Sequence, residues 1–189
     1  MIRLFVLALV LLPTAAFAHP GHDESGLVAG LSHPLTGLDH IAVMIAVGLW
    51  AALKGGKAIW AWPAAFVGVM LVGGAFGMLH MPLPFVEPAI LASVVALGLL
   101  VALAIDLPVS AGVAIIGLFA LFHGHAHGTE APENAGGLEY MAGFAVATVL
   151  LHAVGIAAGM GLGVRFRGLA RVAGAACAAI GLGLAFGVV

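Results

Sequence analysis

Charged residues are scarce in this chain. Only 7% of its 189 residues are Asp, Glu, Lys or Arg, whereas 63% are hydrophobic, and the mean hydropathy is +1.24. Soluble domains usually carry about 25% charged residues. The composition therefore excludes a soluble globular domain and predicts an integral protein of the lipid bilayer. The formal net charge of -2 and the lack of a basic cluster also exclude nucleic acid as a partner.

Cysteine is almost absent. The single Cys177 excludes an internal disulfide and a cysteine-based zinc site. It stands among small apolar residues, where a buried, inert thiol is expected. No nucleotide-binding loop is present, so any energy coupling must come from the membrane potential, an ion gradient or another subunit. Histidine is the exception to this scarcity, with nine residues against six Lys and Arg.

Residues 1–18 have the features of a secretory signal peptide. Arg3 precedes a short apolar core, and small residues flank Phe17, as in an A-x-A cleavage site. The alternative is an uncleaved first membrane helix, for which this core is short. Cleavage after Ala18 would leave His19 as the mature amino terminus, outside the cytoplasm.

Residues 19–32 are expected to form a short extracytoplasmic segment. It contains His19 and His22, with Asp23 and Glu24 close by. A free amine and an imidazole on the same residue can chelate a transition metal. The segment therefore has two interpretations, a metal-collecting tail and an ordinary polar tail.

Six apolar runs follow, each near the roughly 20 residues that a membrane helix needs. Their bounds are 33–53, 59–79, 88–105, 108–127, 138–164 and 168–188. The runs are dense in Gly and Ala, which permit close contact between helices in lipid. We expect residues 33–189 to form one all-α bundle of six transmembrane helices.

The distribution of basic residues predicts the orientation. An extracytoplasmic amino terminus places Lys54 and Lys57 in the cytoplasm after the first span. The same alternation places Arg165, Arg167 and Arg171 there after the fifth. All Lys and Arg residues of the mature chain then lie inside, as the positive-inside rule expects. Both termini are therefore predicted to lie outside.

Three ionisable residues, His33, Asp39 and His40, stand at the start of the first span. In a bilayer such groups are costly unless they are paired, hydrated or bound to a cation. On a helix Asp39 points about 100° away from His40, so it completes a metal site from the side or orients a histidine ring. This motif indicates a functional site.

The residues around this motif predict that it lies on one continuous helix. Ser32 is expected to cap that helix and Pro34 to occupy its first turn. One face would then carry two imidazoles, a glycine gap and a thioether. These residues are His33, Gly37, His40 and Met44, at steps of four, three and four.

The end of the fourth span is also rich in histidine. Helical steps of four and three place His123, His127 and Glu130 on one face. His125 points the other way, and Gly124 and Gly128 leave room for a neighbouring helix. Imidazole and carboxylate groups suit divalent nickel, cobalt, copper or zinc. Two helices with such motifs at the same depth favour a metal site over separate structural histidines.

Other unusual residues follow the same pattern. In the predicted topology His80 and Glu87 lie at the outer face, as do Glu139 and Tyr140. Only His152 lies deep, about midway along the fifth span. The ligand-type residues therefore gather in the extracytoplasmic half.

Both histidine motifs resemble those of the HupE/UreJ family of hydrogenase- and urease-accessory membrane proteins. Residues 33–40 meet its pattern of His, five residues and Asp-His, and residues 122–130 meet Phe-His-Gly-x-Ala-His-Gly-x-Glu. The resemblance also covers the signal peptide and the six spans. It implies a nickel permease, or a cobalt permease in some members, that supplies enzyme maturation.

The resemblance further implies which residues take part in transport. These are His33, Asp39, His40, His123, His127 and Glu130. Outside that set, further candidate ligands are His19, His22, Met44, His80, His125 and His152. We expect no cofactor and no enzymatic activity, with Ni²⁺ or Co²⁺ as the transported substrate.

The sequence therefore predicts a metal-uptake permease of the bacterial inner membrane. Its first and fourth spans would form an outer entry site, and the ion would pass to cytoplasmic metallochaperones. One alternative is a non-transporting metal receptor or scaffold for a partner transporter. Another is a membrane metalloenzyme whose metal activates water, although the sequence identifies neither a base nor a substrate pocket for it. The sequence leaves the metal and the oligomeric state open.

Overall fold

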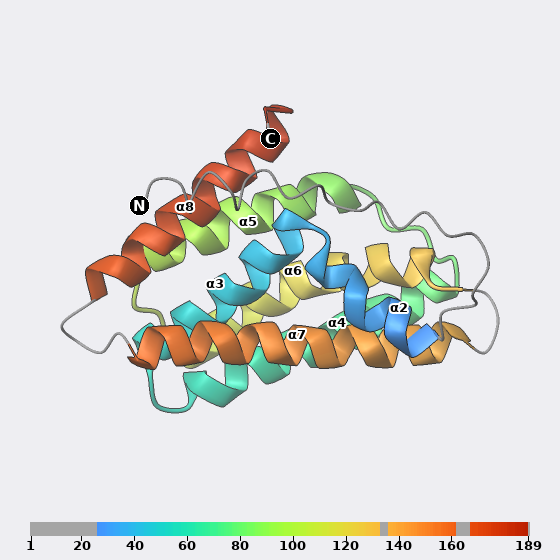
Figure 1. Ribbon diagram of the computed structural model, residues 1–189, viewed down its shortest axis with the longest axis horizontal. Coiled ribbons are helices and arrows are strands. Elements are labelled where there is room, and N and C mark those ends of the chain that lie inside the picture. The colour runs from blue at the N-terminus through green and yellow to red at the C-terminus, as the bar shows by residue number, and fades with distance from the viewer. Residues whose placement is uncertain (1–25, 133–135, 162–166, 189) are drawn as a thin grey trace, which may run out of the picture.

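The computed structural model describes residues 26–132, 136–161 and 167–188 as a helical bundle (Figure 1). Its long helices are α3 (Leu38–Lys54), α4 (Ala58–Met78), α5 (Val86–Ala102), α6 (Val109–Glu130), α7 (Gly136–Gly161) and α8 (Arg167–Ala185). Two short elements precede them, α2 (Gly26–Ser32) and the 3-10 helix η1 (His33–Leu35). No strand occurs within the described ranges. The prediction of an all-α fold is confirmed.

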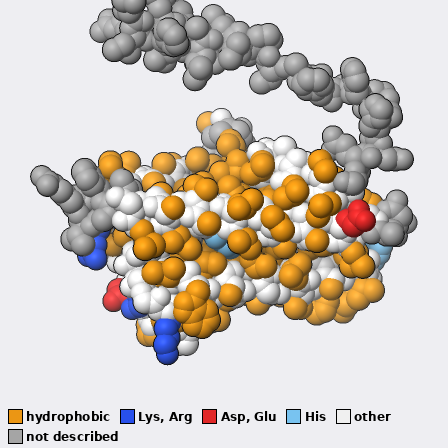
Figure 2. Space-filling view, turned by 60° about the horizontal axis from the view of Figure 1, so that its bottom comes forward, with side chains coloured by type: hydrophobic (Ala, Val, Ile, Leu, Met, Phe, Trp, Pro, Cys, Tyr) orange, Lys and Arg blue, Asp and Glu red, His pale blue; other side chains and the backbone are white. Residues whose placement is uncertain are grey.

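The helices have the length and surface of membrane spans. Four of them, α4, α6, α7 and α8, are long and apolar enough to cross a bilayer. Helix α5 is shorter, with 17 residues, and α3 passes the same test only together with the bent segment before it. Hydrophobic side chains cover most of the face in Figure 2. The chain is a multi-pass membrane protein, and the count of six spans stays a prediction.

Small residues bring the helices together in pairs. Helix α4 packs on α6, and a Cβ atom on Gly124 would collide with the backbone carbonyl of Met70. Helix α3 packs on α7, where a Cβ on Gly48 would collide with the carbonyl of His152. Helices α5 and α8 form the third pair. The predicted role of glycine in close packing is confirmed.

The start of the first predicted span differs from our expectation, because it is broken rather than continuous. The segments Gly26–Leu35 and Leu38–Lys54 meet at 80°. Pro34 lies in the first turn of η1 and has no amide hydrogen to continue the helix before it. Gly37 then adopts an extended backbone, with φ -97° and ψ 124°, from which α3 begins. The prediction of one continuous helix is wrong.

Two further expectations fail with that helix. The Ser32 hydroxyl donates to the Ala29 carbonyl at 3.1 Å and makes no capping hydrogen bond. His33 does not share a helix face with His40, since it lies on η1. Only His40 and Met44 remain one turn apart on α3.

Helix α2 lies against α7 and thereby places η1. A Cβ atom on Gly30 would collide with the carbonyl of Tyr140, and one on Gly143 with the carbonyl of Leu27. The two backbones are therefore in direct contact. This packing holds η1 beside the start of α3 and the end of α6, which we call the histidine end of the bundle.

The opposite end, where α3 ends and α4 begins, is the lysine end. Lys54 forms an ion pair with Asp106, in the connection before α6. The Trp50 indole donates to the Ile105 carbonyl at 2.9 Å, and Arg171 donates to the Ala102 carbonyl at 2.7 Å. In Figure 2 the Lys and Arg side chains of the visible face gather at one end.

Candidate metal centre

Three elements bring ligand-type side chains together at the histidine end. Helix η1 supplies His33, the first turns of α3 supply Asp39 and His40, and the end of α6 supplies His127 and Glu130. Close packing of α6 against α4 requires glycine on the other side of α6, at residues 124 and 128. The alternation of Gly and His in this stretch therefore turns the histidines toward α3 and η1.

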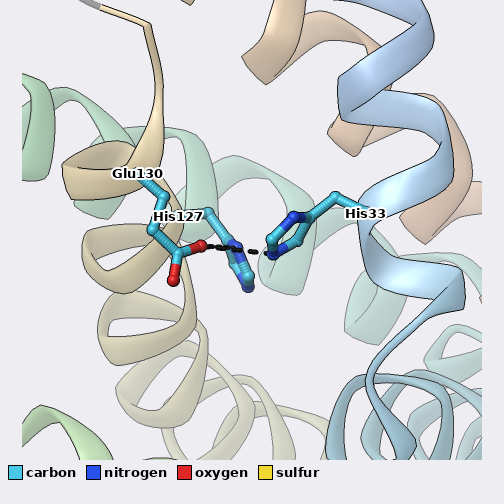
Figure 3. A group of neighbouring side chains, drawn as sticks. All are labelled: His33, His127 and Glu130. Atoms are coloured by element: carbon cyan, nitrogen blue, oxygen red, sulfur yellow. Dashed lines mark hydrogen bonds and ion pairs between the residues drawn. The ribbon is translucent and has the colours of Figure 1, made fainter. Parts of the chain in front are cut away.

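The most exposed part of this cluster consists of His33, His127 and Glu130 (Figure 3). One ligand atom from each residue lies within 4.8 Å of the others. A Glu130 carboxylate oxygen lies 3.2 Å from His33 Nε2 and 3.2 Å from His127 Nδ1. This oxygen therefore joins η1 to α6. Two imidazoles and one carboxylate are a donor set suited to a divalent transition metal.

His40 extends the cluster toward the bundle interior. Its Nδ1 lies 2.8 Å from an Asp39 carboxylate oxygen, and its Nε2 lies 2.5 Å from His127 Nε2. Both rings are buried, with 9% of His40 and 2% of His127 exposed. Asp39 is thus a neighbour that orients His40, one of the two roles that its position on the helix allowed.

The carboxylates determine which nitrogens remain free to bind a cation. An ionised carboxylate only accepts hydrogen bonds, so Nδ1 donates in His40 to Asp39 and in His127 to Glu130. In a neutral imidazole the other nitrogen then carries a lone pair. The two Nε2 lone pairs therefore face each other across 2.5 Å. Such an arrangement is favourable when a proton or a metal ion lies between them.

His123 continues this line of rings. It is fully buried, its Nδ1 donates to the Phe119 carbonyl at 3.1 Å, and its ring centre lies 5.4 Å from that of His40. Its Nε2 has no hydrogen-bond partner among the described residues. The predicted common face of α6 is therefore present, and His123 presents a free lone pair.

Aromatic side chains from α7 form one wall of the cluster. The Phe144 ring stacks on His127 with 4.0 Å between ring centres, and the Tyr140 ring lies 5.8 Å from His33. Both wall residues are buried. The sequence analysis did not identify Phe144 as part of the site. Its position one turn after Tyr140 on α7 was the available signal.

Several other candidates lie outside the cluster. His125 is buried, but its Nε2 donates to the Met81 carbonyl at 2.7 Å, so it joins α6 to the segment after α4. His80 is exposed beyond the end of α4, with a positive φ of 53°. Met44 is fully buried in the core, one turn below His40.

The remaining candidates differ in what the structure describes. His19 and His22 lie outside the described residues, as do the signal peptide and its cleavage site. His152 is 1% exposed and lies deeper in the bundle, on α7. Cys177 is buried and its thiol donates to the Ala42 carbonyl at 3.7 Å, as expected for a structural thiol.

Comparison with known proteins gives one family and one relative. Residues 7–184 match the family described as HupE / UreJ protein. Over 182 residues the chain is 48% identical to Protein HupE from Rhizobium leguminosarum bv. viciae, which covers 96% of this chain and 95% of that protein. No solved structure matches significantly.

Proposed function

Because this chain belongs to the HupE/UreJ family, we propose that it is a permease for uptake of a divalent transition metal ion across the bacterial inner membrane. The substrate is nickel, or cobalt, and it supplies hydrogenase or urease maturation through cytoplasmic metallochaperones. One observation carries the proposal. The Nε2 atoms of His40 and His127 face each other while carboxylates hold both Nδ1 atoms.

The histidine end is the entry site in this proposal. His33, His127 and Glu130 are the first ligands because they include the two most exposed side chains of the cluster, 37% for His33 and 53% for Glu130. His40 then shares the ion with His127. Nitrogen and oxygen ligands of this kind bind nickel and cobalt while leaving exchange possible. A permeation site needs that balance between selection and release.

The charge distribution supports the proposed direction. Lys54, Lys57, Arg167 and Arg171 are basic, and the first of these lies at the lysine end. The positive-inside rule places such residues in the cytoplasm. The histidine end then faces outward, α3 to α8 are the six spans, and residues 1–18 are a cleaved signal peptide. Uptake is the direction that follows.

Accumulation of radioactive nickel in cells tests this function. Cells that express the wild type should accumulate nickel above cells with an empty vector, and cells with His40→Ala should not. Immunoblots of membranes must show equal amounts of both chains. Competition by unlabelled cobalt and zinc ranks the substrates. Nickel that binds to the membranes without entering the cells would instead favour a receptor.

A further inference from the structure

Two buried histidine side chains lack the hydrogen bonds that buried imidazoles usually make. Both ring nitrogens of His152, and Nε2 of His123, have no partner among the described residues. The two residues are 1% and 0% exposed. Buried polar atoms are almost always paired in folded proteins, so unpaired ones need an explanation. His125 shows the usual structural use, since it bonds to the Met81 carbonyl.

The Phe66 ring of α4 connects these two histidines. It lies 5.7 Å from the His123 ring and 5.1 Å from the His152 ring, measured between centres. Phe66 is itself fully buried. The interior between α4, α6 and α7 therefore places one unpaired imidazole on each of two helices, with a shared aromatic neighbour.

Two weaker ligand atoms lie one helical turn from this place. Met70 follows Phe66 by four residues on α4, and Thr148 precedes His152 by four on α7. The Thr148 hydroxyl donates to the Met70 sulfur at 3.7 Å, and both residues are fully buried. A thioether and a hydroxyl oxygen therefore accompany the imidazoles in an otherwise apolar core.

His152 lies well below the entry site. Its backbone carbonyl contacts α3 at Gly48, which follows His40 by eight residues. At about 1.5 Å per residue, eight residues correspond to roughly 12 Å along the helix. His123 lies between, since its ring contacts both His40 and Phe66. The unpaired nitrogens thus continue the line of the entry cluster toward the lysine end.

We propose that His152 is the ligand of a second, deeper site that receives the divalent metal ion from the entry cluster, with His123 as the ligand between the two. This inference rests on the proposed permease function. The deep site holds nickel or cobalt in transit through imidazole nitrogen, helped by the Met70 sulfur. Its unpaired nitrogens become satisfied when the ion is present.

Two substitutions of His152 separate a ligand from a packing residue. His152→Phe keeps an aromatic ring against Phe66 but has no ligand atom. His152→Cys loses the ring but offers a thiolate. A ligand role predicts that nickel uptake by the Phe variant falls about tenfold or more, while the Cys variant retains more uptake and shifts its preference toward zinc. A packing role predicts the opposite order, and that result would overturn the proposal.

The kinetics of uptake give a second criterion. Loss of the deep ligand should lower the maximal rate while the half-saturating nickel concentration stays unchanged, because the entry cluster is intact. Ser93→Ala is the matched control, since Ser93 is a fully buried polar residue on α5 that bonds only within its own helix, to Ile90. It should transport like the wild type.

Failure of the deep site and failure of the permease function give different results. A wild type that takes up no nickel contradicts both. A wild type that transports, with His152→Phe equally active, contradicts the deep site alone. Should neither variant reach the membrane, His152→Gln fills the space with a poor nickel ligand. Full uptake by that variant overturns the proposal, and loss of uptake at normal abundance supports it.

Discussion

The two ends of the bundle use polar residues in different ways. At the histidine end, side chains from η1, α3 and α6 converge, and two of the imidazoles are almost fully buried. At the lysine end, Lys54 and Asp106 form one ion pair whose acidic partner is 76% exposed. Burying unsatisfied polar groups is costly, whereas an exposed ion pair contributes little. The comparison indicates that function lies at the histidine end and that the lysine end determines orientation.

Removal of His127 should break the comparison most strongly. Its ring contacts Glu130, His40 and Phe144, so His127→Asn removes the central ligand of the entry cluster. We expect nickel uptake to fall roughly 100-fold, at the upper end of what loss of a metal-site residue costs. Uptake by cells at equal protein abundance measures it.

A histidine at the same end but outside the cluster serves as the control. His80→Asn changes an exposed residue beyond α4 and should leave uptake within about twofold of the wild type, because surface substitutions have small effects. If His127→Asn retained half of the wild-type uptake, the cluster could not be the entry site.

Acid should weaken the histidine end. Free imidazole titrates near pH 6.5, and only the neutral ring binds metal. The neutral form is favoured above that pH, so capture is present at pH 7.5 and is lost as the pH falls. Between pH 7.5 and 5.5 the neutral fraction of such a group falls about tenfold.

Initial uptake rates at subsaturating nickel, with the cytoplasm held at constant pH, test this expectation. The rate should decline below about pH 6. A rate that rises steadily to pH 5 would argue against neutral imidazole as the ligand.

Helix packing behind the cluster should matter more than packing elsewhere on α6. A side chain at Gly124 would collide with the Met70 backbone, whereas one at Gly117 would meet only the Val69 side chain, at 3.6 Å. Overpacking costs about 1–3 kcal/mol, so Gly124→Val should reduce the folded protein several-fold. Gly117→Val is the matched control. Thermal unfolding in detergent compares them, and equal melting temperatures would contradict the packing found here.

The lysine end should show the smallest effect. Replacement of its ion pair by Lys54→Gln together with Asp106→Asn removes an interaction worth about 0–1 kcal/mol. Nickel uptake should stay within about twofold of the wild type. A tenfold loss in the same uptake assay would show that this end also belongs to the transport path.

Much of the fold and of the cluster could be predicted from the sequence, because composition and helical spacing are local properties. Apolar runs and abundant glycine predicted the helices and their close packing, and steps of four and three placed His123, His127 and Glu130 on one face. Those three side chains do face the start of α3 or η1. The family patterns singled out the same residues.

The break before α3 could not be predicted in this way. Pro34 suits the first turn of a helix that starts at residue 32, and equally a short helix that ends there. Contacts of α2 with α7, such as Gly30 against Tyr140, decide between the two. The aromatic partners Phe66 and Phe144 were missed for the same reason. Their role depends on which helices become neighbours.

Transport by the purified chain alone tests the central claim most directly. Liposomes that contain the wild type and an enclosed nickel-sensitive dye should report nickel entering the lumen under an imposed membrane potential, and liposomes with His40→Ala should not. The proposed permease predicts this difference without any other protein present. Nickel that binds to the wild type, with no signal from the enclosed dye under any imposed gradient, would contradict it and favour a metal receptor.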